Sequence, residues 1–164
     1  MANYFDNIKN VPTHVVAESS RLKATTVGHI ADLEMIEDTD NGTIVAIGDH
    51  VEGQLFKAKK YAEGDKPYLV LTTPIAYNGR KIWSDEKYFY NAKGEVARAY
   101  ELHVDDIYTV SADAFTGAPA VGKFVDGTHT VADVAGNGFV GQIIEEVNYT
   151  NSVSYRVRVV ALGA

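Results

Sequence analysis

The chain of 164 residues contains no cysteine, and this absence removes several kinds of structure and chemistry at once. Disulfide bonds, thiolate zinc sites and cysteine nucleophiles all need the thiol group. The fold must therefore be held by packing alone. Hydrophobic residues make up 46% of the chain and charged residues 23%, which predicts a folded protein with a real core and not a disordered chain.

Positive charge is scarce, and the formal net charge is -7. No lysine or arginine run is longer than the pair Lys59-Lys60, so no segment resembles a surface that follows a phosphate backbone. We do not expect nucleic acid as a partner. An acidic balance favours solubility and would also suit docking on a basic protein surface.

Long apolar runs are absent as well. No stretch approaches the roughly 20 apolar residues that a membrane-spanning helix needs. Residues 1–13 are polar and interrupted by Asp6, Lys9 and Pro12, unlike the basic start and apolar run of a signal peptide. We therefore expect synthesis in the cytoplasm and no membrane partner.

Short β-prone segments separated by glycine and asparagine turns occupy most of the chain. In the last of them Tyr155, Val157 and Val159 alternate with Arg156 and Arg158, the pattern of a half-buried strand. The sequence predicts a mainly all-β fold, a small sandwich or barrel with at most one or two short helices, one of them at 84–90. The predicted strands are 27–35, 43–47, 54–61, 68–73, 95–102, 107–110, 121–125, 128–134, 139–147 and 154–162.

Two turn signals predict hairpins. Asp40-Asn41-Gly42 is a strong turn sequence, and it predicts that segments 27–35 and 43–47 pair around it. The turn residues 148–151 predict a terminal hairpin between segments 139–147 and 154–162. The residues Ala31 to Met35 would also tolerate a helix.

The length favours one domain, a β-rich body over residues 14–164 preceded by an N-terminal arm over residues 1–13. Tyr4, Phe5 and Ile8 are the large apolar residues of this arm before Val11 and stand among asparagines. Either they anchor an extended arm on a neighbouring subunit, or the terminus lies on its own domain or frays.

Few motifs suggest bound groups. Residues 136–141 match the GxGxxG spacing, but too little chain follows for a nucleotide-binding sheet, so a plain turn is favoured. The acidic segment 37–42 resembles a calcium loop whose glycine falls one position early, which favours an acidic turn. No serine stands on a glycine-flanked elbow. We expect no catalysis, no cofactor and no metal.

His103 and Asp105 are the best candidate metal ligands, because they could share one face of a strand. No third ligand stands at a diagnostic spacing, and the other histidines are scattered. Structural or solvated roles are therefore favoured over a metal site. The other histidines are His14, His29, His50 and His129.

Five aromatic residues gather between positions 77 and 90 and form the best candidate for a recognition surface, with core packing as the favoured alternative. They are Tyr77, Trp83, Tyr88, Phe89 and Tyr90.

The arm-like Ala2-Asn3-Tyr4-Phe5, the strand 107–110, the small-residue loop and turn of 118–125 and the closing segment 141–145 together resemble capsid decoration proteins of tailed bacteriophages. The resemblance lies mainly in residues 105–162. It implies a protein without catalysis on the outside of an assembled virion, where it binds the major capsid protein and forms homo-oligomeric contacts. Tyr4, Phe5 and Ile8 would then be the partner-binding residues.

Other functions fit the same features. Within a virion, a tail or head-fibre component is the leading alternative. Outside virions, a small carbohydrate- or ligand-binding β module comes next, and a metal-dependent hydrolase using His103 and Asp105 follows.

Overall fold

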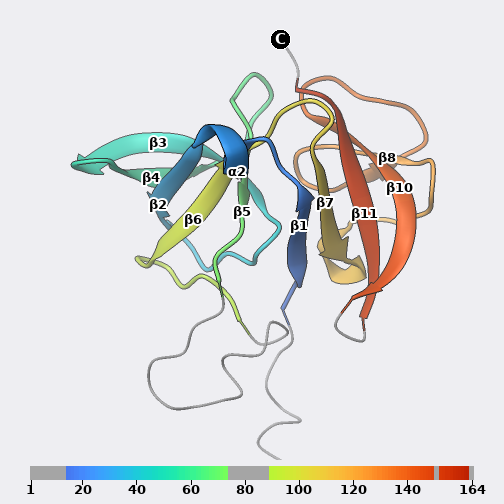
Figure 1. Cartoon of the computed structure of the whole chain (residues 1–164), viewed down its shortest axis with the longest axis horizontal. Coiled ribbons are helices and arrows are strands. Elements are labelled where there is room, and N and C mark those ends of the chain that lie inside the picture. The colour runs from blue at the N-terminus through green and yellow to red at the C-terminus, as the bar shows by residue number, and fades with distance from the viewer. Residues whose placement is uncertain (1–13, 74–88, 150–151, 163–164) are drawn as a thin grey trace, which may run out of the picture.

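The computed structural model describes residues 14–73, 89–149 and 152–162 (Figure 1). Strands form nearly all of the regular structure, which confirms the predicted all-β class. Within these ranges the helical segments are a single turn, α2 (Ala24–Val27), and a 3₁₀ turn, η2 (Ala112–Ala114). No described helix has the length and apolar character needed to cross a membrane.

Five strands close into a small barrel in the order β2-β4-β3-β5-β6, on the left of Figure 1. Strand β2 pairs parallel to β4 and antiparallel to β6, and the other pairs are antiparallel. The barrel strands are β2 (Ile30–Glu34), β3 (Ile44–Glu52), β4 (Leu55–Lys60), β5 (Tyr68–Val70) and β6 (Val96–Glu101).

Six strands form an antiparallel sheet beside the barrel, in the order β1-β7-β11-β10-β8-β9. The long hairpin of β10 and β11 is its centre, and it confirms the predicted terminal hairpin. The sheet strands are β1 (Ala17–Arg21), β7 (Ile107–Ser111), β8 (Phe124–Val125), β9 (Val131–Ala132), β10 (Val140–Tyr149) and β11 (Ser152–Ala161).

The barrel interior is narrow and is filled partly by small side chains. Ala58, Ala97 and Ala99 are buried there beside Leu33 and Val70. A barrel of five strands leaves little space around its axis, so alanine fits where larger residues would clash. The alternation of alanine with exposed residues in β6 follows from this.

A second core joins the barrel to the sheet. Tyr108, Val110 and Val157 of the sheet lie in the same buried cluster as Ile44 and Leu69 of the barrel. Each fully buried aliphatic side chain of this kind contributes about 1.5–3 kcal/mol through burial. The two β layers are therefore held together by a continuous apolar contact.

The predicted hairpin around Asn41-Gly42 is wrong, although a turn is present there. Strand β2 pairs with β4 and β6, whereas β3 pairs with β4 and β5, so the strands on either side of the turn are not partners. Tertiary bonds fix the turn instead: the Gly42 amide donates to the Val70 carbonyl over 2.8 Å. A turn sequence determines only the local backbone conformation, whereas the partners of each strand follow from the closure of the barrel.

Several other boundaries differ from the predictions. The segments 121–125 and 128–134 contain the two-residue strands β8 and β9. Strand β1 and helix α2 were not predicted, because their sequences show neither strict alternation nor a helix cap. The arm 1–13 and most of the predicted helical turn at 84–90 lie outside the described residues.

Candidate functional site

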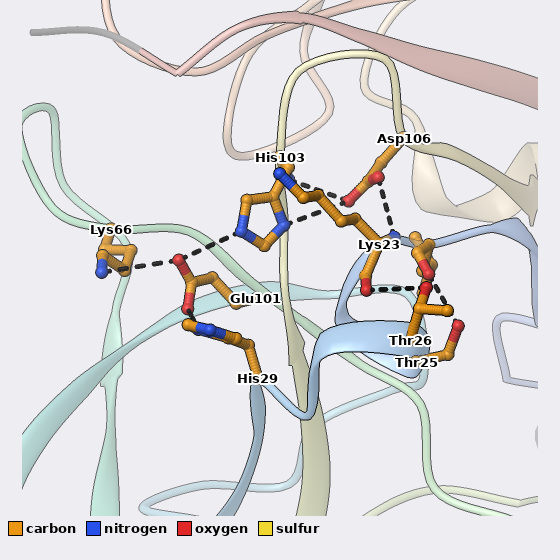
Figure 2. A network of polar contacts seen from close by, with 9 residues as sticks. Lys23, Thr25, Thr26, His29, Lys66, Glu101, His103 and Asp106 are labelled. Atoms are coloured by element: carbon orange, nitrogen blue, oxygen red, sulfur yellow. Dashed lines mark hydrogen bonds and ion pairs between the residues drawn. The ribbon is translucent and has the colours of Figure 1, made fainter.

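His29, Glu101 and His103 gather where the chain passes from the barrel to the sheet (Figure 2). His29 lies between α2 and β2, Glu101 ends β6, and His103 lies in the connection between β6 and β7. We refer to these three residues as the histidine–glutamate cluster.

Strand pairing brings the cluster together. In the antiparallel register of β2 and β6, Ile30 lies opposite Tyr100. The ladder continues by one bond, since the Glu101 amide donates to the His29 carbonyl over 3.0 Å. His103 follows Glu101 by two residues and so adds a third ligand group beside the first two.

The polar atoms of the cluster are close to one another. His29 Nδ1 lies 2.7 Å from Glu101 Oε2, and His103 Nε2 lies 3.4 Å from Glu101 Oε1. One ligand atom from each of the three side chains lies within 4.8 Å of the others. The Glu101 side chain is 10% exposed and that of His29 is 52% exposed, so the site opens to solvent on the His29 side.

Nitrogen atoms of three side chains surround the Glu101 carboxylate. Lys66 Nζ lies 3.4 Å from Oε1 in addition to the two histidines. Burial raises the pKa of Glu101, but the hydrogen bond with His29 and the charges of Lys66 and His103 outweigh it and hold this pKa below its ordinary value. The carboxylate is therefore ionised at neutral pH.

A second carboxylate faces His103 from the opposite side. Asp106 is 3% exposed, and its Oδ2 lies 3.7 Å from His103 Nδ1. The backbone amides of Lys23 and His103 donate to Asp106 over 3.0 and 2.8 Å and fix its position. The buried His103 Nδ1 itself has no hydrogen-bond partner within the described part of the chain.

The candidate pairing of His103 with Asp105, which the sequence already disfavoured, does not form. Asp105 adopts a left-handed backbone conformation with φ 73°, and its carboxylate accepts a bond from Arg158 Nε over 3.0 Å. The extended chain ends before this residue, so the two side chains do not share a strand face. Neither His29 nor Glu101 was predicted as a site residue. The Glu101-x-His103 spacing at the end of a predicted strand was an available signal for Glu101, whereas His29 lies 72 residues earlier and had none.

The other predicted motifs have structural roles or lie elsewhere. Residues 136–141 form the loop that enters β10 and the first residues of that strand, which confirms a turn there. In the acidic segment, Asp38 accepts the Lys93 amide over 2.9 Å, and Asp40 binds His14 over 2.6 Å. These two acids therefore have separate partners.

Most of the predicted recognition residues lie outside the described ranges. This holds for Tyr4, Phe5 and Ile8 of the arm and for Tyr77, Trp83 and Tyr88 of the aromatic group. Within the described residues, Tyr90 stacks on His14 with ring centroids 4.7 Å apart, and Phe89 is half-buried.

An exposed apolar pair lies at the end of the sheet. Val121 and Val134 are 60% and 76% exposed. Because β8 and β9 pair antiparallel, the residues just before β8 and those just after β9 lie at the same end of the two strands. The Lys123 ammonium lies 3.3 Å from the Asp133 carboxylate there. We refer to Val121 and Val134 as the valine pair.

A closed five-stranded barrel fused to a six-stranded sheet, with a polar cluster at the junction, defines a β-rich protein of two packed layers. The model of the YonC prophage protein family matches residues 10–162. The chain therefore belongs to the YonC prophage protein family and is phage-derived. No curated protein and no solved structure matches the chain significantly.

Proposed function

We propose that this chain is a structural protein of a phage virion that acts without catalysis, binding the outside of the assembled capsid and adding contacts between major capsid subunits. Its membership in a prophage protein family is the observation that carries the proposal. The resemblance of residues 105–162 to capsid decoration proteins is the reason for proposing the capsid surface as the binding site.

The valine pair is the described surface best suited to such binding. Val134 and Val121 are the two most exposed large apolar side chains among the described residues, and covering them with a partner would gain free energy. The small residues around Val121, such as Ala118 and Ala120, let a partner approach closely. Tyr4, Phe5 and Ile8 remain predicted arm anchors on the same partner.

The role relies on repeated weak contacts. Each copy would bind the assembled shell in preference to free subunits, and this preference stabilises the shell by mass action. Capsid symmetry repeats the contact many times, so a small interface on each copy is sufficient.

Co-sedimentation of the full-length protein with undecorated, expanded heads of the parent phage tests the proposal. We expect saturable binding and heads that resist heat or dilution better. We expect Val134 to be among the minority of contact residues whose loss costs more than about 1 kcal/mol, so Val134→Lys should weaken binding about tenfold. Val96→Lys is the matched control, because Val96 is a barrel valine that is 53% exposed.

Two outcomes would contradict the proposal. One is the absence of binding to heads while the protein binds isolated tails, which would make it a tail component. The other is equal loss of head binding in Val134→Lys and Val96→Lys, which would move the contact away from the valine pair.

A further inference from the structure

We propose that His29, Glu101 and His103 bind one zinc ion that ties the start of β2 to the connection between β6 and β7. The proposal is independent of the capsid role. It rests on the geometry of the histidine–glutamate cluster and on the two carboxylates that face His103.

The spacing of the donor atoms fits a tetrahedral ion. Zinc binds imidazole nitrogen and carboxylate oxygen at about 2.0–2.2 Å, which places neighbouring ligands roughly 3.4 Å apart. His103 Nε2 and Glu101 Oε1 are already separated by 3.4 Å. His29 Nδ1 now lies 2.7 Å from Glu101 Oε2 and must move away from this oxygen to bind the ion. The half-exposed His29 side chain has room for this movement.

The surroundings of His103 favour a cation on Nε2. A neutral imidazole carries one N–H and one lone pair, so in either tautomer the lone pair points at a carboxylate, Glu101 on one side or Asp106 on the other. A zinc ion on Nε2 uses that lone pair and leaves the Nδ1 proton facing Asp106. Zinc-bound histidines are commonly oriented by a carboxylate in this way.

The donor set favours a transition metal over magnesium or calcium. Two imidazoles and one carboxylate suit zinc, whereas magnesium and calcium prefer sites made of oxygen atoms. Three protein ligands leave a fourth position that faces solvent on the His29 side, where water completes the tetrahedron.

Lys66 opposes metal binding in a measurable way. Its ammonium lies 3.4 Å from Glu101 Oε1, an atom that a zinc ion would approach. The Lys66 side chain is 64% exposed, so its removal should tighten zinc binding only about two- to fivefold, the range of a solvent-exposed ion pair.

Calorimetric titration of the EDTA-treated full-length protein with zinc tests the site. We expect one zinc per chain. We also expect visible absorption of a bound cobalt(II) ion, with the intensity of tetrahedral coordination. His103→Ala should abolish both signals, whereas Lys66→Gln should strengthen zinc binding. The increase with Lys66→Gln cannot be explained by failure of a variant to fold.

Two variants serve as controls. His50→Ala removes an exposed histidine of β3 outside the cluster, and Asp105→Asn changes the carboxylate that binds Arg158. Both should bind zinc with unchanged affinity. The proposal is overturned if wild type takes up no zinc, if His103→Ala binds as well as wild type, or if Lys66→Gln weakens binding.

Discussion

Substitution of Gly42 by alanine probes the contact between the barrel and the sheet. Gly42 precedes β3 and has φ +89°, a backbone conformation that residues with a side chain rarely adopt. A Cβ atom there would lie 2.7 Å from Val110 Cγ1 in β7 and 3.1 Å from Ala17 Cβ in β1. The added methyl group would therefore press into the core that joins the two layers.

The expected cost has two parts. Left-handed backbone costs an alanine about 1–2 kcal/mol. Overpacking adds about 1–3 kcal/mol, because Val110 is fully buried and β-branched and cannot turn away. We expect Gly42→Ala to lower the free energy of unfolding by about 2–5 kcal/mol, a large fraction of the 5–15 kcal/mol of an ordinary domain.

Gly64→Ala is the matched control, because Gly64 has φ +94° but open space where its Cβ would stand. It should show the backbone cost alone. Equilibrium unfolding in urea measures the free energy of unfolding of both variants, and the two can be compared directly when their m-values are equal. If the two variants lose the same stability within about 0.5 kcal/mol, the close approach of this turn to β1 and β7 is refuted.

Two further predictions concern buried polar groups. Burial lowers the pKa of His129 from 6.5 to about 4 despite the nearby charge of Asp126. The unfolded histidine then binds a proton at a pH where the folded one does not, so about 3 kcal/mol of stability should be lost as pH falls from 6.5 to 4. Urea unfolding of the wild type between pH 6.5 and 4 should show this loss of stability. If His129→Gln shows the same loss, protonation of His129 is not its cause. The Asn41 side chain accepts from the Thr72 amide over 3.0 Å and donates to the Thr72 carbonyl over 2.9 Å. Asn41→Ala should cost about 1–3 kcal/mol by leaving both groups without a partner, and an unchanged hydrogen-exchange rate of the Thr72 amide would count against this.

Strand existence was predictable because it depends on local residue pattern. The alternation of Tyr155, Val157 and Val159 with two arginines identifies β11, and its pairing with β10 was predictable from the turn-forming sequence at 148–151. Local signals failed where pairing is nonlocal. Barrel closure places β4 between β2 and β3, and no residue of the Asn41-Gly42 turn encodes that order.

Strand β1 shows a second limit of local patterns. Its sequence, Ala17 to Arg21, carries serine and charge and lacks a clear apolar alternation. It forms because β7 offers a free edge, with Ala17 opposite Val110 and Ser19 opposite Tyr108. An edge strand of this kind is stabilised mainly by backbone hydrogen bonds, which any sequence without proline can supply.

The candidate site was half visible in the sequence. Glu101 and His103 are separated by one residue, and that spacing is available to inspection, whereas His29 lies 72 residues before Glu101. Only the register of β2 against β6 places the two side chains together. A one-residue slip of that register would turn His29 away from Glu101 and move Leu33 out of the barrel core. The apolar packing that closes the barrel therefore also holds the cluster in place, so a zinc ion bound there would in turn favour the native register.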